Sequence, residues 1–227
     1  QVAILLGESN RILSINILLY LPKVSNQPLP AFLTLNFQGN HTVHSDPAIL
    51  LPNTWVRNRN GIKDNQAREK DRGLAASRWA INEMINRGYA FATVYYGDID
   101  PDFDDGFQNG IHALFPLLES EKRKRSDWGS IAGWAWGLSR CLDYLEQDPR
   151  IDGKRVAVMG HSRLGKTSLW AGAIDKRFAM VISNNSGCGG AALSRRRFGE
   201  TVKRINTSFP HWFCDSLLVE WKPNRMV

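Results

Sequence analysis

Strand-like and helix-like segments alternate along most of this chain, and this alternation limits the folds that it can adopt. Compact apolar runs predict strands at residues 15–21, 31–36, 90–96, 155–159 and 178–183. Apolar residues at spacings of three and four predict helices at 77–87, with Ser77 as N-cap, and at 131–146 and 164–173. Strands separated by helices form a largely parallel sheet with helices on both faces, so the sequence predicts an α/β fold.

The chain has no repeat and no linker that would divide it, so its 227 residues predict a single domain, 1–227. Its net charge of +7 comes partly from two short basic clusters, at residues 122–125 and 195–197. We interpret these clusters as solvated surface and expect no nucleic-acid partner. No apolar run approaches the roughly 20 residues that span a bilayer, so we expect no membrane partner. We expect a monomer.

Neither the cysteines nor the acidic residues form a metal-binding pattern. Cys141 is predicted to lie in the core, whereas Cys188 and Cys214 could pair, although nothing in the sequence requires it. An acidic run from Asp98 to Asp105 fails the calcium-loop pattern, because its sixth and twelfth positions lack the required glycine and glutamate. We interpret this run as an acidic loop at the end of a strand, and we expect no cofactor and no metal.

The segment from Gly160 to Thr167 (GHSRLGKT) has two possible chemistries. It matches a phosphate-binding loop, in which Lys166 would reach the terminal phosphates and Thr167 would hold magnesium. It also matches a nucleophile elbow, a sharp strand-to-helix turn that exposes the Ser162 hydroxyl and places the Arg163 amide at a developing oxyanion. The second glycine of the elbow, Gly165, is one position later than usual.

Other parts of the sequence favour the elbow. The strand after the motif ends in Ser-Asn-Asn-Ser and offers no acidic residue for magnesium. The segment Asn36–His41 (NFQGNH) follows an early strand, where hydrolases place the second half of the oxyanion hole. The residues therefore favour a serine esterase, and a phosphate-loop nucleotide hydrolase remains the alternative.

Several long motifs, in order, resemble the glucuronoyl esterases of carbohydrate esterase family 15, and the bacterial members in particular. They run from near the N-terminus to about Leu217: NFQGNH (36–41), VYYGDIDP (94–101), WAWGLSR (134–140), GHSRLGK (160–166), SGCGG (186–190) and FPHWF (209–213). The resemblance explains the displaced Gly165 and implies an α/β-hydrolase fold.

The resemblance also implies an activity. Ser162 would attack the ester of a (4-O-methyl-)glucuronic acid of glucuronoxylan with an alcohol such as those of lignin, and form an acyl-enzyme. Arg163 would stabilise the oxyanion with its side chain as well as its amide. Lys166 and Glu200 match positions that bind hydroxyls of the uronic acid. Without the resemblance, both would be interpreted as ordinary surface charges. It further implies secretion or a periplasmic location, although no signal peptide is visible.

The sequence departs from the family in its acid and its histidine. Asn185 stands where fungal members carry a glutamate, and an amide cannot replace a carboxylate beside an imidazolium. The family histidine lies downstream of Val227, and His211 is a weak substitute candidate. We therefore expect an incomplete catalytic domain that lacks the final strands, the closing helix, the histidine and the acid. An inactive carbohydrate-binding relative is a further alternative.

Overall fold

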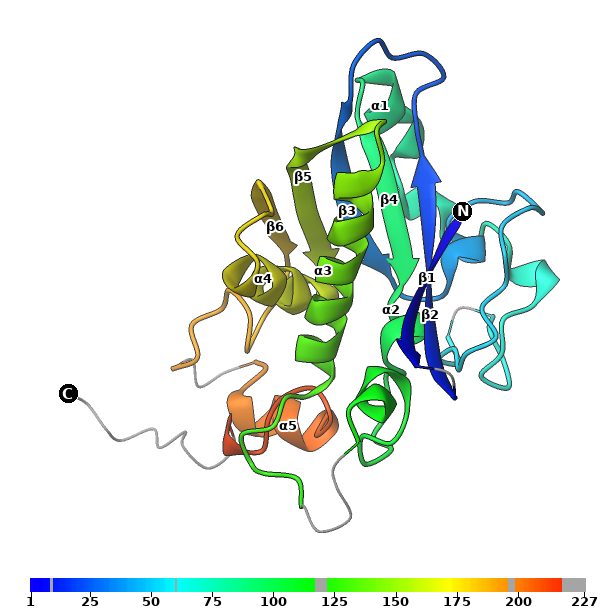
Figure 1. Cartoon of the computed structure of the whole chain (residues 1–227). Coiled ribbons are helices and arrows are strands. Elements are labelled where there is room, and N and C mark those ends of the chain that lie inside the picture. The colour runs from blue at the N-terminus through cyan, green and yellow to red at the C-terminus, as the bar shows by residue number, and fades with distance from the viewer. Residues whose placement is uncertain (9, 60, 117–121, 196–198, 218–227) are drawn as a thin grey trace.

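A computed structural model describes residues 1–8, 10–59, 61–116, 122–195 and 199–217 (Figure 1). It contains one six-stranded sheet in the order β1-β2-β4-β3-β5-β6. The strands are β1 (Val2–Glu8), β2 (Arg11–Tyr20), β3 (Leu29–Asn36), β4 (Ala90–Tyr95), β5 (Ile151–His161) and β6 (Met180–Asn184). The first two are antiparallel to their neighbours, and the other four are parallel to one another. The fold is thus the predicted α/β-hydrolase type.

Helices cover both faces of the sheet. The helices are α1 (Ile81–Asn86), α2 (Tyr96–Ile99), α3 (Ser130–Gln147), α4 (Arg163–Ile174) and α5 (Val202–Ser208). On β4, Ala92 and Val94 belong to the large core with α3 and α4, whereas Phe91 belongs to a smaller core with Ile81 of α1. Because successive strand residues point to opposite faces, α1 lies on the face opposite α3 and α4.

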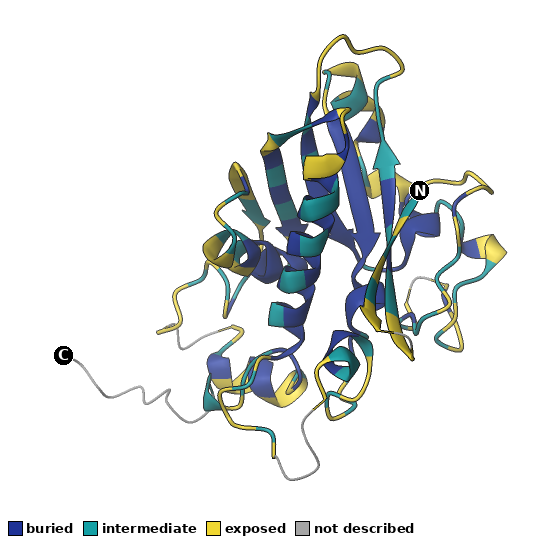
Figure 2. Cartoon of the chain, viewed as in Figure 1, coloured by how far each residue is buried: buried dark blue, intermediate teal, exposed yellow. Residues whose placement is uncertain are grey.

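Burial follows the position of each strand. Every residue of β4 is buried, whereas β1 is exposed or half-buried along its length (Figure 2). At the other edge of the described sheet, β6 exposes Met180 and Val181. A hollow of about 480 Å³ lies on the α1 side, lined among others by Trp79, Met159 and Ile182. The central strands therefore carry the core, and the β6 side is only partly covered by the described residues.

The predicted secondary structure omitted the short helices α2 and α5 and was also wrong at Ser77 and at β1. Ser77 does not cap a helix, because it lies inside the short 3-10 helix Ala76–Arg78, and α1 begins only at Ile81. The N-terminal strand β1 was not predicted at all, since its only described sheet partner is β2 and it lacks a continuous buried face. Within β1, Gly7 pairs with Ile12 of β2 and has a φ of 116°, a conformation that favours glycine.

Cys141 is buried in the core as predicted, and all three cysteines are free. Among the described residues, no helix is long and apolar enough to cross a membrane, and no three metal-binding side chains form a cluster. Arg123 from the first basic cluster packs on Phe107, with its Cζ 3.4 Å from the ring centroid, while residues 196–197 of the second cluster lie outside the described residues.

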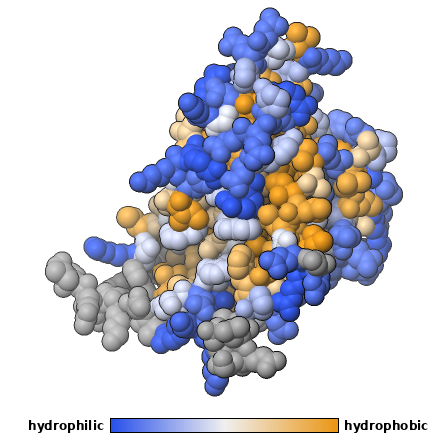
Figure 3. Space-filling model, viewed as in Figure 1, coloured by the Kyte–Doolittle hydropathy of each residue, from blue (hydrophilic) through white to orange (hydrophobic). Residues whose placement is uncertain are grey.

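Figure 3 shows a largely hydrophilic face on which hydrophobic side chains gather beside the β1–β2 hairpin.

Candidate active site

Ser162 lies in a sharp turn between β5 and α4, at the carboxyl ends of the parallel strands. Its backbone has φ 57° and ψ −126°, a conformation that costs energy for any residue with a side chain. Helix α4 begins at the next residue, and the Ser162 amide donates a hydrogen bond of 2.9 Å to the Asn184 carbonyl. Such a strained turn between strand and helix is the geometry of a nucleophile elbow.

The two glycines of the motif allow this turn to close. A Cβ on Gly160 would lie 2.1 Å from the carbonyl oxygen of Leu164, so any side chain there would collide with the first turn of α4. A Cβ on Gly165 would lie 3.1 Å from the carbonyl oxygens of Gly160 and Asn184, a tighter contact than is usual. The displaced second glycine therefore serves close packing between α4 and the ends of β5 and β6.

The Asn36–His41 loop lies beside the elbow. Both neighbours of Ser162 contact the ring of Phe37: the His161 ring centroid lies 6.4 Å away, and the Arg163 Cζ lies 5.6 Å away. Asn36 holds the loop, because its side chain accepts from the Gly39 amide at 2.9 Å and donates to Asn40 at 2.7 Å. The loop is thus fixed next to the serine, where the sequence places the second half of an oxyanion hole.

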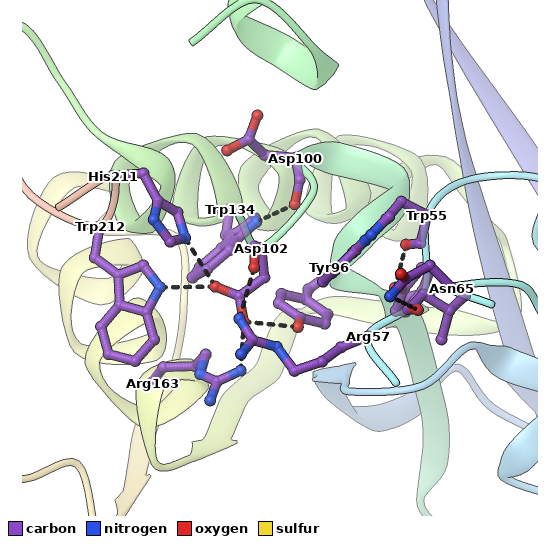
Figure 4. Close-up of polar contacts among 12 residues, drawn as sticks. Trp55, Arg57, Asn65, Tyr96, Asp100, Asp102, Trp134, Arg163, His211 and Trp212 are labelled. Carbon is purple, nitrogen blue, oxygen red and sulfur yellow. Dashed lines mark hydrogen bonds and ion pairs between the residues drawn. The ribbon is translucent and has the colours of Figure 1, made fainter. Parts of the chain in front are cut away.

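A fully buried carboxylate, Asp102, forms the centre of the polar cluster shown in Figure 4. Its Oδ2 accepts hydrogen bonds from Arg163 at 2.5 Å, Arg57 at 2.8 Å and the Tyr96 hydroxyl at 2.9 Å. Its Oδ1 accepts from Trp212 Nε1 at 2.7 Å and lies 3.0 Å from His211 Nε2. This carboxylate therefore joins the elbow to three other segments of the chain.

The cluster keeps Asp102 ionised. Burial by itself raises the pKa of a carboxyl group, but the hydrogen bond from His211 and the charges of Arg163 and Arg57 outweigh it, so the pKa of Asp102 lies below its ordinary value. Two guanidinium groups against one carboxylate leave the cluster with a net positive charge. An anion that develops beside Arg163 would be stabilised by that charge.

Lys166 and Glu200 meet close to Arg163, since Lys166 Nζ and Arg163 Cζ lie 5.7 Å and 4.9 Å from the centroid of the same Trp212 ring. Lys166 is buried, and its Nζ donates to the Ser186 carbonyl at 2.6 Å and lies 3.6 Å from Glu200 Oε2. Glu200 is 42% exposed and accepts from the Cys188 amide at 3.2 Å. Burial lowers the pKa of Lys166, and the charge of Glu200 acts in the opposite direction. Lys166 is therefore not the surface charge that its sequence context alone suggests.

This geometry does not suit a phosphate-binding loop. Lys166 points to Ser186 and Glu200 from within α4, and the Thr167 hydroxyl donates to the Arg163 carbonyl at 3.0 Å. Both side chains that would hold phosphate and magnesium are thus engaged within the protein.

Within the described residues, which include all five histidines, no side chain makes a hydrogen bond with the Ser162 hydroxyl. His211 instead contacts Asp102 through Nε2, and its Nδ1 is buried with no partner in the described part of the chain. His161 is exposed and packs edge-on against Phe37. The five histidines thus leave the serine without a hydrogen-bonded base in this structure.

The model for "Glucuronyl esterase, fungi" matches residues 80–215 of the chain. This chain belongs to the glucuronoyl esterase family. A carbohydrate esterase named MZ0003, from an unknown prokaryotic organism, is 57% identical over 216 residues, which make up 94% of this chain and 50% of that protein. A 4-O-methyl-glucuronoyl methylesterase of Cerrena unicolor is 36% identical over 106 residues, or 46% of this chain and 22% of that protein.

Solved structures of the family agree with the fold. A promiscuous CE15 esterase from a marine bacterial metagenome superposes with a TM-score of 0.89 at 54% identity and covers 98% of this chain and 56% of its own. A glucuronoyl esterase from Solibacter usitatus gives a TM-score of 0.82 at 47% identity, covering 90% of this chain and 52% of its own. The chain thus spans about half the length of these relatives, and the bacterial resemblance stated from the motifs is confirmed.

Proposed function

We propose that this chain forms the nucleophile half of a serine esterase that cleaves esters of glucuronic acid. The observation that carries the proposal is the strained Ser162 turn next to Arg163, in a member of the glucuronoyl esterase family. Ser162 attacks the C6 carbonyl of the ester, the alcohol leaves, and water then cleaves the acyl-enzyme.

The oxyanion of each tetrahedral intermediate lies between the elbow and the Asn36–His41 loop. The Arg163 amide at the N-terminus of α4 and the Arg163 guanidinium supply hydrogen bonds and positive charge. The Arg163 side chain is only 12% exposed and so largely shielded from water, which strengthens its effect on a nearby charge.

Lys166 and Glu200 bind hydroxyl groups of the uronic acid. One donor and one acceptor 3.6 Å apart can share a hydroxyl, which donates to the carboxylate and accepts from the ammonium. The substrate is a (4-O-methyl-)glucuronoyl ester of glucuronoxylan, such as a lignin–carbohydrate ester. Several relatives carry the name 4-O-methyl-glucuronoyl methylesterase.

The general base and its acid come from chain outside these 227 residues. Two findings support this: no side chain of the described residues bonds to the Ser162 hydroxyl, and the chain spans about half the length of its relatives. The complete protein acts as a secreted or periplasmic monomer that needs no cofactor.

A direct test compares this chain with an extended chain, made by joining residues 1–217 to the C-terminal part of the 57% identical carbohydrate esterase. We expect the extended chain to hydrolyse a benzyl ester of glucuronic acid and the short chain to be inactive, with release of benzyl alcohol as the measurement. No hydrolysis by a folded extended chain would contradict the proposal. Magnesium-dependent ATP binding that is lost in Lys166→Ala would instead support a nucleotide hydrolase.

A further inference from the structure

We propose that Asp102 is a positioning residue that fixes the Arg163 guanidinium beside Ser162. This inference rests on the esterase function proposed above. It concerns a residue that makes no contribution as acid, base or metal ligand.

The hydrogen bonds of Asp102 exclude a direct chemical role. A carboxylate offers about four acceptor positions, and here five donor groups share its two oxygens. The side chain is also fully buried, so neither water nor substrate reaches it. Asp102 therefore acts only through the groups that it holds.

Arg163 depends on Asp102 for its orientation. Its single hydrogen bond within the described residues runs from Nη1 to Asp102, and its Nε is buried without a partner there. Other neighbours of the guanidinium in the described part of the chain are the rings of Phe37, Phe209 and Trp212. With Nη1 held, the Nη2 donors remain free for an oxyanion.

Asp102 also positions the ring on which Arg163 lies. The Arg163 Cζ is 4.9 Å from the centroid of Trp212, which Asp102 holds through the indole N–H. Trp212 in turn stacks on Phe209 with ring centroids 3.8 Å apart. The one carboxylate thus sets both the hydrogen bond and the flat surface that define the guanidinium plane.

Arg57 completes the arrangement from the other side. Its Nη2 donates to both the backbone carbonyl of Asp102, at 2.6 Å, and the carboxylate, at 2.8 Å. This pair of bonds fixes the Asp102 rotamer. The second cation also ensures that the carboxylate does not cancel the positive charge that Arg163 presents.

An amide cannot replace this carboxylate. In Asp102→Asn one oxygen becomes an N–H donor, which must face either Arg163 or Trp212, both donors themselves. We expect kcat of the extended chain on the benzyl ester of glucuronic acid to fall about 10- to 100-fold, with KM changed less than about threefold.

A double-mutant cycle separates positioning from simple stabilisation. Arg163→Gln removes the guanidinium, so adding Asp102→Asn to it should lower kcat no further. Asp148→Asn is the matched control, since Asp148 is likewise buried and held by an arginine and a tyrosine, but at the far end of α3. It should lower the melting temperature and leave kcat unchanged.

If Asp102→Asn does not fold, Asp102→Asn combined with Arg57→Gln keeps the net charge of the cluster and takes its place. The proposal expects this folded variant to retain the loss of kcat. A kcat equal to that of the parent in either variant would overturn the proposal. So would a double variant with Arg163→Gln whose loss of kcat equals the product of the two single losses. If Ser162→Ala leaves hydrolysis intact, the esterase proposal itself fails; if only the Asp102 effect is missing, the positioning role alone fails.

Discussion

Two buried aspartates, at opposite ends of the strands, are held in contrasting ways. Asp148 accepts from Tyr144 at 2.9 Å and from the Arg150 side chain at 2.6 and 2.8 Å, and these partners lie within four residues. The partners of Asp102 include Arg57, Arg163 and His211, which lie 45, 61 and 109 residues away. The first cluster is local, whereas the second brings distant segments together.

The two clusters use the same aspartate–arginine hydrogen bonds for different purposes. The Asp148 cluster organises the connection between α3 and β5, which chain proximity already favours. The Asp102 cluster holds segments whose closure costs more entropy, at the carboxyl ends of the strands where sites form in such sheets. The local Asp148 cluster, at the amino ends of the strands, should therefore affect stability. The long-range Asp102 cluster should affect catalysis.

The largest effect on stability should come from adding a methyl group at Gly160, in the turn before α4. In Gly160→Ala the new Cβ would lie 2.1 Å from the Leu164 carbonyl oxygen, a backbone atom that cannot move without disturbing α4. We expect a loss of more than about 3 kcal/mol in the free energy of unfolding. Gly88→Ala, before β4, is the control: its φ of 81° costs about 1 kcal/mol, but no atom lies within 4 Å. Urea unfolding compares them, and equal losses would contradict the elbow geometry.

Lys166→Met should weaken substrate binding while keeping the side-chain volume. Loss of a charged hydrogen bond to a sugar hydroxyl costs about 1.5 to 3 kcal/mol, so KM of the extended chain should rise about 10- to 100-fold. Steady-state kinetics on the glucuronate ester give the result. Since Lys166 also donates to the Ser186 carbonyl, the melting temperature of the variant must be measured together with its KM. An unchanged KM in the folded variant would remove Lys166 from the binding site.

Asp148→Asn should affect stability alone. It replaces the acceptor of a two-point contact from Arg150 by an amide, which should cost about 1 to 3 kcal/mol. For a chain of this size the melting temperature should fall by several degrees. Thermal unfolding followed by circular dichroism measures this, and a fall in kcat at temperatures where the variant is folded would break the contrast with Asp102.

The smallest effect concerns Asp100, whose carboxylate points away from the Asp102 cluster (Figure 4). Burial raises the pKa of Asp100 to about 8, and burial lowers the pKa of nearby His112 to about 4. A raised carboxyl pKa gives stability that is complete below the unfolded pKa and is lost as pH rises to about 8. Between about pH 4 and 6.5, His112 changes stability in the opposite direction, so the Asp100 effect is unopposed from about 6.5 to 8.

Asp100→Asn should therefore abolish a fall of up to about 2 kcal/mol between pH 6.5 and 8. Melting temperatures of parent and variant across this interval provide the measurement. Asp148→Asn should leave the slope unchanged, because the pKa of Asp148 is lowered by its hydrogen bonds with Arg150 and lies far from this interval. Parallel curves for parent and Asp100→Asn would show that Asp100 does not titrate there.

The sequence predicted the sheet well and the polar cluster poorly. Buried parallel strands are continuous apolar runs, so β3, β4 and β5 could be recognised locally. The edge strand β6 is also an apolar run, although it exposes Met180 and Val181, and the Ser162 turn followed from its motif. Asp102 belonged to an acidic run interpreted as a loop. Its burial depends on Arg57 and Arg163, which no local pattern connects to it. Strand β1 was missed for a similar reason, because it is defined by its pairing with β2 and not by a buried apolar run of its own.

The Ser162→Ala variant of the extended chain tests the account most directly. It removes only the hydroxyl oxygen from the turn between β5 and α4, and no hydrogen bond of the described residues depends on that atom. The account predicts a folded protein with the parent melting temperature and with hydrolysis of the glucuronate ester reduced at least about 1,000-fold. Hydrolysis within tenfold of the parent would show that the elbow serine is not the nucleophile.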